Sequence, residues 1–301
     1  LVVNGDESEP GTYKDRLLME RDPHQLIEGC LIAAYAAGLA QVFLYIRGEM
    51  PLAHERVGQA LNEAYAAGYV GKNILGTNFS VDIVLHWGAG AYVVGEETAL
   101  IESLEGKRGE PRLKPPFFPA AIGLYGQPTI VNNVETLSNL PWLLVNGTEA
   151  YTAIGTQTSP GTRMVAVSGH VNRPGVYEIV NGTTTFRDLF YGQEFCQGIR
   201  NGNELKAFVP GGGSAPWFTP EQLDLPFEGR LVGAAGSMLG SGAIMVMDHT
   251  TDIPAAAREQ FDRVGRFGQN ARAGRLDADT WPLLLLAEAA LAELGSDADR
   301  V

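Results

Sequence analysis

The chain has 301 residues, and 45% of them are hydrophobic, which is enough for two compact domains or three small ones. The 35 acidic residues outnumber the 22 basic ones, so the net charge is −13, and a surface this acidic argues against nucleic acid and membrane-surface partners. Two cysteines, Cys30 and Cys196, are too few for a disulfide framework or a four-thiolate metal cluster. Glycine is unusually frequent at 37 residues, against an average of about 7%.

The ends of the chain carry no pattern typical of a targeting or membrane-spanning segment. The opening residues LVVNGDESEPG have no basic region followed by an apolar stretch, as a signal peptide would. Residues 1–3 are typical of the end of a buried strand, so we expect a fragment. The apolar run 281–287 is much shorter than the ~20 residues of a membrane span. We therefore expect a soluble, cytoplasmic polypeptide with reduced cysteines.

The first part of the chain alternates helical and strand patterns. An apolar helical stripe covers residues 23–38, a strand pattern covers 41–46, a second helix covers 51–67, and a second strand covers 80–86. This order predicts an α/β layer with functional loops at the ends of its strands.

From residue 163 the pattern becomes rich in short strands. Strands are expected at 164–168 and 176–180, then a helix capped by Thr185, then a strand at 205–209. These elements predict a small β-rich module wrapped around one helix. From about residue 253 the chain is rich in alanine and leucine and predicts helices.

An acidic segment, residues 4–11, follows the first strand. Asp6, Glu7 and Glu9 place three carboxylates in four positions, and these repel one another unless a ligand shares their lone pairs. Ribose and ribityl hydroxyls can do so, and Asn4 can accept from or donate to them. The alternative is a solvated acidic turn.

A glycine-containing loop at residues 86–98 follows a later strand. Glycine there lets the backbone approach a ligand closely, but the spacing differs from the dinucleotide-binding pattern G-x-G-x-x-G. The alternative is a packing turn, in which Glu96 and Glu97 only complement the dipole of the helix that begins at Thr98.

Two further stretches could take part in ligand binding. In 131–137, Asn133 is a good N-cap, and the helix start it predicts can bind phosphate; the alternative is a plain capped helix. In 112–119, a proline-rich apolar strip carries Lys114, Phe117 and Phe118, whose rings either stack on a planar base or pack internally.

In this order, the motifs closely resemble those of the flavoprotein subunit of NADH-quinone oxidoreductase, the NADH-oxidising 51 kDa component of respiratory complex I. The resemblance covers roughly residues 1–250, and its long motifs lie at 4–16, 88–106, 112–120, 127–141, 167–179 and 236–248. It implies an α/β fold class. An FMN-binding α/β sandwich without its N-terminal part is expected over 1–150. A β-grasp, soluble-ligand-binding domain is expected over 160–235, and a linker with a helical C-terminal segment over 236–301.

The resemblance also implies an oxidoreductase that transfers a hydride from NADH to FMN and passes electrons on towards quinone. The cofactor performs this chemistry, so no catalytic side chain is expected. The implied FMN-binding residues are Asn4, Asp6, Ser8, Tyr92, Gly95, Glu96, Val131, Asn132, Asn133 and Thr136. The implied NADH-binding residues are Glu9, Glu97, Lys114, Phe117 and Phe118. Carboxylates near the ribose would repel a 2′-phosphate, which predicts a preference for NADH over NADPH.

The sequence departs from this family in two places. The family's glycine-rich phosphate loop lies upstream of Leu1, and the stretch 253–274, where the family has a cysteine motif for a 4Fe-4S cluster, contains no cysteine. We therefore expect FMN and NAD(H) as cofactors, and no metal ligands. The implied partners are other NADH dehydrogenase subunits, notably the small thioredoxin-like 2Fe-2S subunit, which would hold the chain at the inner membrane without direct insertion.

Two alternative functions stay open. The diaphorase subunits of NAD-linked hydrogenases and formate dehydrogenases share these motifs. A different class of function is a binding or docking module without activity.

Overall fold

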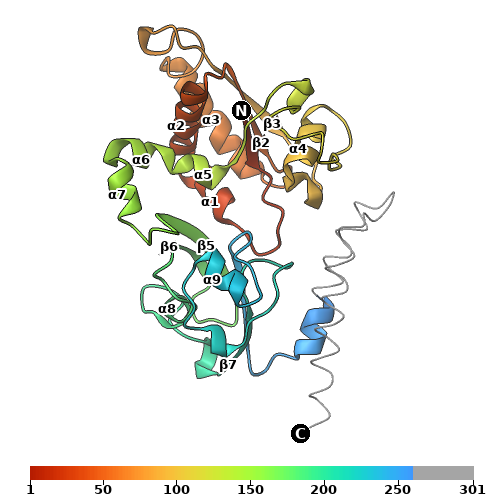
Figure 1. The fold of residues 1–301 in the computed structure, drawn as a ribbon, viewed down its shortest axis with the longest axis vertical. Coiled ribbons are helices and arrows are strands. Elements are labelled where there is room, and N and C mark those ends of the chain that lie inside the picture. The colour runs from red at the N-terminus through yellow and green to blue at the C-terminus, as the bar shows by residue number, and fades with distance from the viewer. Residues whose placement is uncertain (260–301) are drawn as a thin grey trace. The chain divides into compact units, whose positions relative to one another are not determined.

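The computed structural model describes residues 1–259 (Figure 1). These residues divide into two compact units. The first contains residues 1–8 and 13–164, and the second contains residues 9–12 and the chain from residue 165 onward. None of the helices in the described part is long and apolar enough to cross a membrane.

The first unit is built on a parallel four-stranded sheet with the order β3-β2-β1-β4. Its strands are β1 Val2–Gly5, β2 Gln41–Ile46, β3 Asp82–Trp87 and β4 Val131–Asn133. In the register of β1 with β4, Asn4 lies opposite Asn133. Because the strands are parallel, the loops that follow β1, β3 and β4 all leave the same edge of the sheet. These are the loops that the sequence motifs predict to bind a ligand.

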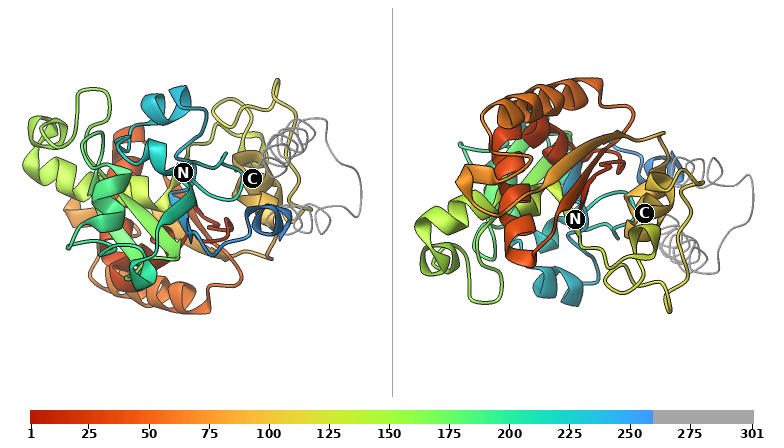
Figure 2. Two further views of the ribbon diagram at one scale, coloured as in Figure 1. Left: turned by 90° about the horizontal axis from the view of Figure 1, so that it is seen from below. Right: turned by 90° about the horizontal axis from the view of Figure 1, so that it is seen from above.

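Helices cover both faces of this sheet. The helices of the unit are α1 Lys14–Arg21, α2 Pro23–Ala37, α3 Pro51–Ala66, α4 Glu97–Leu104, α5 Val134–Ser138, α6 Leu140–Asn146 and α7 Thr148–Thr152, with 3₁₀ turns η1 Ile74–Gly76, η2 Tyr92–Gly95 and η3 Leu124–Gly126; α6 and α7 follow α5 and do not lie on the sheet. Val3 packs into the core shared with α1, α2 and α3, whereas Val2 packs into the one shared with α4. Figure 2 shows the red and orange helices on one side of the strands and α4, in yellow, on the other.

Local signals explain why these elements form where they do. In α2, Pro23 occupies the first turn, Asp22 caps the N-terminus through the backbone N–H of Gln25, and Gly38 ends the helix with a φ of 66°. The helix predicted over 23–38 and the strand predicted over 41–46 are confirmed. The strand predicted at 80–86 is displaced by two residues at its start, where it begins with Asp82.

The second unit contains a mixed four-stranded sheet with the order β6-β5-β8-β7. Its strands are β5 Thr162–Gly169, β6 Gly175–Val180, β7 Leu205–Val209 and β8 Ala243–Asp248; its helical segments are α8 Phe186–Tyr191, α9 Gly229–Ala234, η4 Arg200–Gly202 and η5 Pro220–Gln222. Thr185 and Asp188 form a capping box at the start of α8. Phe186 is fully buried and contacts the rings of Phe190, Phe208, Phe218 and Phe227.

The structure corrects the expectation of a linker that begins at residue 236. Residues 243–248 form β8, which pairs in parallel with β5 and antiparallel with β7. The strand is almost entirely buried, because a central position in the sheet covers both of its faces. The described chain turns helical at residue 253 and ends at 259, so the rest of the expected helical segment lies outside the described residues.

Candidate functional site

The loop that follows β1 meets the loop that follows β3 at the carboxyl edge of the first unit's sheet. The side-chain amide of Asn4 donates to the carbonyl oxygen of Gly95 over 2.9 Å, and its oxygen accepts from the backbone N–H of Asp6 over 3.1 Å. Ser8 Oγ donates to Asp6 Oδ2 over 2.8 Å. Four of the predicted FMN-binding residues are therefore brought together.

Glycine suits position 95 because the two loops approach closely. A Cβ atom there would lie 3.1 Å from the carbonyl oxygen of Asp6, which is tighter than an ordinary van der Waals contact. The hydrogen bond from Asn4 and the absence of a side chain at Gly95 together allow the loop after β1 to lie close to the loop after β3.

Asp6 is the most informative member of this group. Only 6% of the residue is exposed, and its Oδ1 atom has no hydrogen-bond partner within residues 1–259. Burial raises the pKa of Asp6 to about 6, although the hydrogen bond from Ser8 and the charge of Arg47 oppose the rise. A buried carboxylate oxygen without a donor is costly. A hydroxyl or ring N–H of a bound ligand would satisfy it, which fits FMN.

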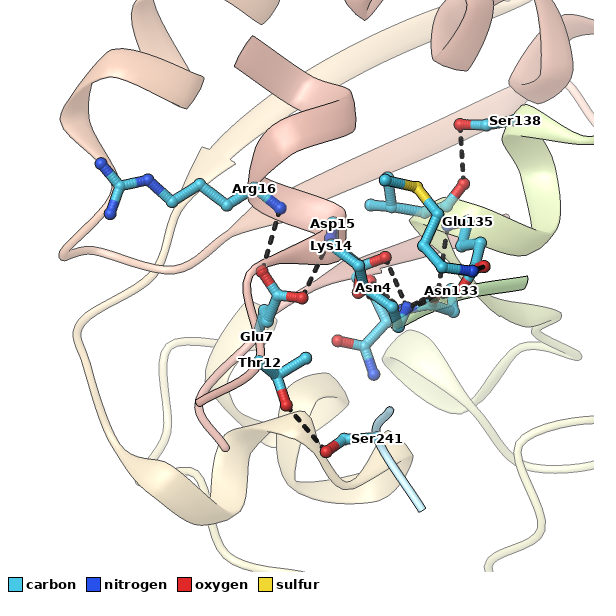
Figure 3. A network of polar contacts seen from close by, with 12 residues as sticks. Asn4, Glu7, Thr12, Lys14, Asp15, Arg16, Asn133, Glu135, Ser138 and Ser241 are labelled. Carbon is cyan, nitrogen blue, oxygen red and sulfur yellow. Dashed lines mark hydrogen bonds and ion pairs between the residues drawn. The ribbon is translucent and has the colours of Figure 1, made fainter. Parts of the chain in front are cut away.

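A buried polar network lies directly behind this loop, between β1, α1 and the start of α5 (Figure 3). Lys14 Nζ lies 2.7 Å from Asp15 Oδ1, 3.0 Å from Glu135 Oε2 and 3.1 Å from Asn133 Oδ1. Asn133 Nδ2 in turn donates to Asp15 Oδ2 over 2.7 Å and to the carbonyl oxygen of Asn4 over 3.3 Å. Burial disfavours the ammonium form of Lys14, but the two carboxylates outweigh it and raise the pKa of Lys14.

Glu7 caps the start of α1 from the same loop. Its two carboxylate oxygens accept from the backbone N–H groups of Asp15, over 2.9 Å, and Arg16, over 3.0 Å. Burial, together with the neighbouring charge of Asp15, raises the pKa of Glu7 to about 7. The sequence indicated Glu7 only as one carboxylate of the acidic segment and not as a helix cap. It indicated no role for Lys14, Asp15 or Glu135, because only the tertiary fold brings residues 14–15 to residues 133–135.

A second cluster joins the start of α4 to the proline-rich strip. Glu96 Oε2 accepts from the backbone N–H groups of Thr98, over 2.9 Å, and Ala99, over 3.0 Å, and so caps α4. Lys114 Nζ lies 2.8 Å from Glu96 Oε1 and 2.6 Å from Glu97 Oε1. Burial alone would raise the pKa of Glu96, but its bonds with Lys114 and Thr98 prevail and lower it. The predicted residues Glu96, Glu97 and Lys114 therefore lie together.

The strip keeps both predicted aromatic rings accessible. Phe117 is 38% exposed and Phe118 is 51% exposed, so either ring has a surface on which a base could stack. Arg112 fixes the strip in place: its backbone N–H donates to Thr98 Oγ1 over 2.8 Å, and its guanidinium donates to the carbonyl oxygen of Gly123 over 3.0 Å.

The remaining predicted residues are less closely connected. Asn133 caps α5, as predicted, by accepting from the backbone N–H of Glu135 over 3.0 Å, but this side chain is already used within the protein. Three others occupy η2, β4 and the exposed side of α5: Tyr92 is half-buried, Asn132 is half-buried, and Thr136 is exposed. Val131 packs at the margin of the core beside α4.

Glu9 belongs to the second unit. Its carboxylate accepts a hydrogen bond from the backbone N–H of Gly213 in that unit. Thr12, from the same short segment 9–12, donates from Oγ1 to Ser241 Oγ over 2.7 Å. The expected role of Glu9 in NADH binding stays a prediction.

The two cysteines lie in apolar cores. Cys30 and Cys196 are both fully buried, and burial raises the pKa of each thiol to about 12. No group of three or more histidine, cysteine or acidic side chains within residues 1–259 is arranged to hold a metal ion. The cysteine-free stretch 253–274 lies largely outside the described residues.

Comparison with known proteins identifies the segment that carries this site. Residues 1–142 match the family model of the Nuo51 FMN-binding domain. This segment is therefore similar to the FMN-binding domain of that family. The match includes all of the predicted FMN-binding residues and the Lys114 cluster.

Relatives extend the similarity beyond this domain. The chain is 51% identical over 258 residues to the F subunit of NADH-quinone oxidoreductase from Mycobacterium tuberculosis strain H37Rv, an alignment that covers 86% of this chain and 57% of the relative. It is 47% identical over 263 residues to the corresponding F subunit from Escherichia coli K12, covering 87% of this chain and 58% of the relative. The chain thus spans a little over half the length of the curated relatives it matches.

A solved structure shows the same fold. The air-oxidised NAD⁺-reducing [NiFe]-hydrogenase aligns with a TM-score of 0.78 and 33% sequence identity, over 98% of this chain and 47% of the hydrogenase chain. The similarity therefore includes the second unit as well as the first.

Proposed function

We propose that this chain forms the FMN- and NADH-binding part of an NADH dehydrogenase flavoprotein subunit, which takes a hydride from NADH and passes electrons on towards quinone. One observation carries the proposal: in the segment that matches the Nuo51 FMN-binding domain, Asn4 and Gly95 bring two loops together around Asp6, whose buried Oδ1 has no partner within residues 1–259. This arrangement is suited to a ligand that is both flat and rich in hydrogen-bond donors.

The residues of the first unit fit FMN in distinct ways. Asp6 and Ser8 offer polar atoms to hydroxyl or ring N–H groups, and Gly95, which has no side chain, lets the backbone lie close to a flat ring. When bound, FMN supplies the hydride-accepting chemistry, so the protein needs to bind and orient rather than act as a general acid or base. The proposal assigns the remaining contacts to Asn4, Tyr92, Glu96, Val131, Asn132, Asn133 and Thr136.

The Lys114 cluster is the proposed binding site for NADH. Ribose hydroxyls can replace the ion pair of Glu97 with Lys114, and the exposed rings of Phe117 and Phe118 offer a stacking surface for adenine. Glu9 is proposed to bind the same substrate. The carboxylates of Glu96 and Glu97 at the Lys114 cluster would disfavour the 2′-phosphate of NADPH.

The residues do not fit a 4Fe-4S cluster. Both cysteines are buried in apolar cores with raised pKa values, and thiolate is the form that binds iron. As the electron acceptor we propose a partner subunit, the small thioredoxin-like 2Fe-2S protein. Assembly with partner subunits would hold the chain at the inner membrane.

The proposal is tested by measuring bound flavin and NADH–ferricyanide activity for the full chain and two variants. Asp6→Asn leaves the shape intact but removes one acceptor, so both flavin content and activity should fall. Asp22→Asn keeps its helix-capping oxygen and serves as the control. Absence of flavin from the unaltered chain at saturating FMN would favour a docking module without activity.

A second candidate is the diaphorase subunit of an NAD-linked hydrogenase. The 0.78 TM-score over 98% of the chain favours it. The flavin chemistry would be the same and the partners would differ, so the subunits that co-purify with the chain distinguish the two assignments.

A further inference from the structure

The buried ion cluster behind the loop that follows β1 has a role beyond the proposed ligand contacts. We propose that Lys14 is a positioning residue for the flavin site, because it fixes the orientation of the Asn133 amide and, through it, the end of β1. The inference rests on the proposed function, since it concerns the residues proposed to hold FMN.

The hydrogen bonds of Asn133 permit one amide orientation. Its Oδ1 atom accepts from Lys14 Nζ over 3.1 Å and from the backbone N–H of Glu135 over 3.0 Å. Its Nδ2 atom donates to Asp15 Oδ2 over 2.7 Å and to the carbonyl oxygen of Asn4 over 3.3 Å. A flipped amide would direct N–H groups at an ammonium and a backbone N–H, and an oxygen at a carboxylate and a carbonyl.

This orientation is transmitted to the proposed flavin site through Asn4. Asn4 lies opposite Asn133 in the parallel pairing of β1 with β4. While its carbonyl oxygen accepts from Asn133, its side chain holds the carbonyl of Gly95 and the backbone N–H of Asp6. Asn133 and Asn4 thus link Lys14 to Asp6 and Gly95 through consecutive hydrogen bonds.

Lys14 also supplies the positive charge of a largely buried cluster. The side chains of Lys14, Asp15 and Glu135 are 12%, 5% and 18% exposed. Without the ammonium, the carboxylates of Asp15 and Glu135 that both contact it would lose their shared positive partner. That loss disfavours the ionised cluster and removes the donor that selects the amide orientation.

A variant of Asp15 gives an independent test of the amide orientation of Asn133. Asp15 uses one carboxylate oxygen for Lys14 and the other for Asn133. In Asp15→Asn, the new side chain has one acceptor oxygen, so its NH₂ group must face either Lys14 or the Asn133 amide. This variant keeps the side-chain volume while it disturbs the same orientation.

The experiment measures FMN dissociation constants and NADH–ferricyanide kinetics for the full chain, with circular dichroism to establish folding. Lys14→Met should raise the dissociation constant of FMN by about tenfold or more. At saturating FMN it should lower kcat with little change in the KM for NADH, because flavin orientation is disturbed and the Lys114 cluster is not. Lys14→Arg should recover part of the loss. The control, Arg16→Met, breaks an exposed ion pair with Glu20 on the same helix and should change neither constant beyond about twofold.

A merely structural role would lower thermal stability while the folded protein kept its FMN affinity and kcat. That result for Lys14→Met would overturn the inference. If Lys14→Met fails to fold, Asp15→Asn decides: weakened FMN binding supports the inference, and unaltered binding overturns it. If the unaltered chain binds no FMN, the proposed function itself fails, and the inference falls with it.

Discussion

The side-chain amide of Asn4 donates to the carbonyl oxygen of Gly95 over 2.9 Å, although the two residues are 91 positions apart in the sequence. This bond ties the loop after β1 to the turn before α4 and leaves the buried Asp6 between them. In Asn4→Ala both hydrogen bonds of the amide are lost, so the two loops should separate. We expect FMN affinity to fall by about tenfold, as measured by fluorescence titration.

The control for this variant is Asn146→Ala. Asn146 also donates to a backbone carbonyl over 2.9 Å, but at the exposed end of α6. Equal FMN affinities of the two variants would show that the Asn4–Gly95 bond has no part in binding.

The raised pKa of Asp6 predicts a specific pH dependence of stability. The pKa rises from 3.8 to about 6 in the folded protein, so the folded state binds the proton more tightly than the unfolded chain does. The stabilising contribution is complete below pH 4 and is lost as the pH rises through 6. With about 1.4 kcal/mol for each pKa unit, urea unfolding should show that Asp6→Asn gains about 2–3 kcal/mol relative to the unaltered chain between pH 4 and pH 8.

Asp224→Asn is the control for this pH dependence. The pKa of Asp224 is lowered by its hydrogen bond with Arg187, and the side chain is 74% exposed. No comparable gain should appear in that variant. A stability difference between Asp6→Asn and the unaltered chain that does not vary with pH would contradict the assigned cause.

Close packing of α2 against α5 predicts a large effect at Gly29. A Cβ atom on Gly29 would lie 2.1 Å from the carbonyl oxygen of Leu137, so the helices would have to move apart. Gly29→Ala should lower the free energy of unfolding by about 2 kcal/mol or more. Gly58→Ala in α3 meets only an ordinary contact with Leu85 at 3.5 Å and should be neutral or stabilising by up to about 1 kcal/mol. Equal stabilities of the two variants would argue against this packing.

The ion pair of Glu97 with Lys114 predicts altered nucleotide binding. Glu97→Gln removes a carboxylate proposed to bind ribose hydroxyls, so the KM for NADH should rise severalfold while the flavin content stays unchanged. The preference for NADH over NADPH should also weaken, because less negative charge faces the 2′-phosphate. Steady-state kinetics with both nucleotides measure this, and Glu110→Gln, which alters an exposed pair with Arg108, is the control. If the chain is a scaffold that binds no nucleotide, neither Glu97→Gln nor Glu110→Gln should alter the kinetics with NADH or NADPH.

Local signals in the sequence predicted a substantial part of the fold. The apolar stripe, Pro23 and Gly38 define α2, because a helix is specified by its own periodicity and caps. The strand β8 was missed, because its short apolar run follows glycines and its central place in the sheet depends on pairing with β5 and β7.

In the candidate site, too, local motifs could be predicted from the sequence and contacts between distant residues could not. The motif around Asn4 and Asp6 and the turn at Gly95 are readable, since each lies within a few consecutive residues. The cluster of Lys14, Asp15 and Glu135 is not readable, because parallel strand pairing brings residues more than 100 positions apart into contact. Sequence patterns also do not show that the side chain of Asn133 forms hydrogen bonds with Lys14, Asp15 and the backbone of Asn4.

The central claim is that this chain binds FMN so that NADH can reduce it. The most direct measurement is an anaerobic titration of the FMN-loaded full chain with NADH, followed by the visible absorption of the flavin. We predict stoichiometric bleaching by NADH and much weaker bleaching by NADPH at the same concentration. A flavin that stays bound and oxidised in excess NADH would contradict the claim.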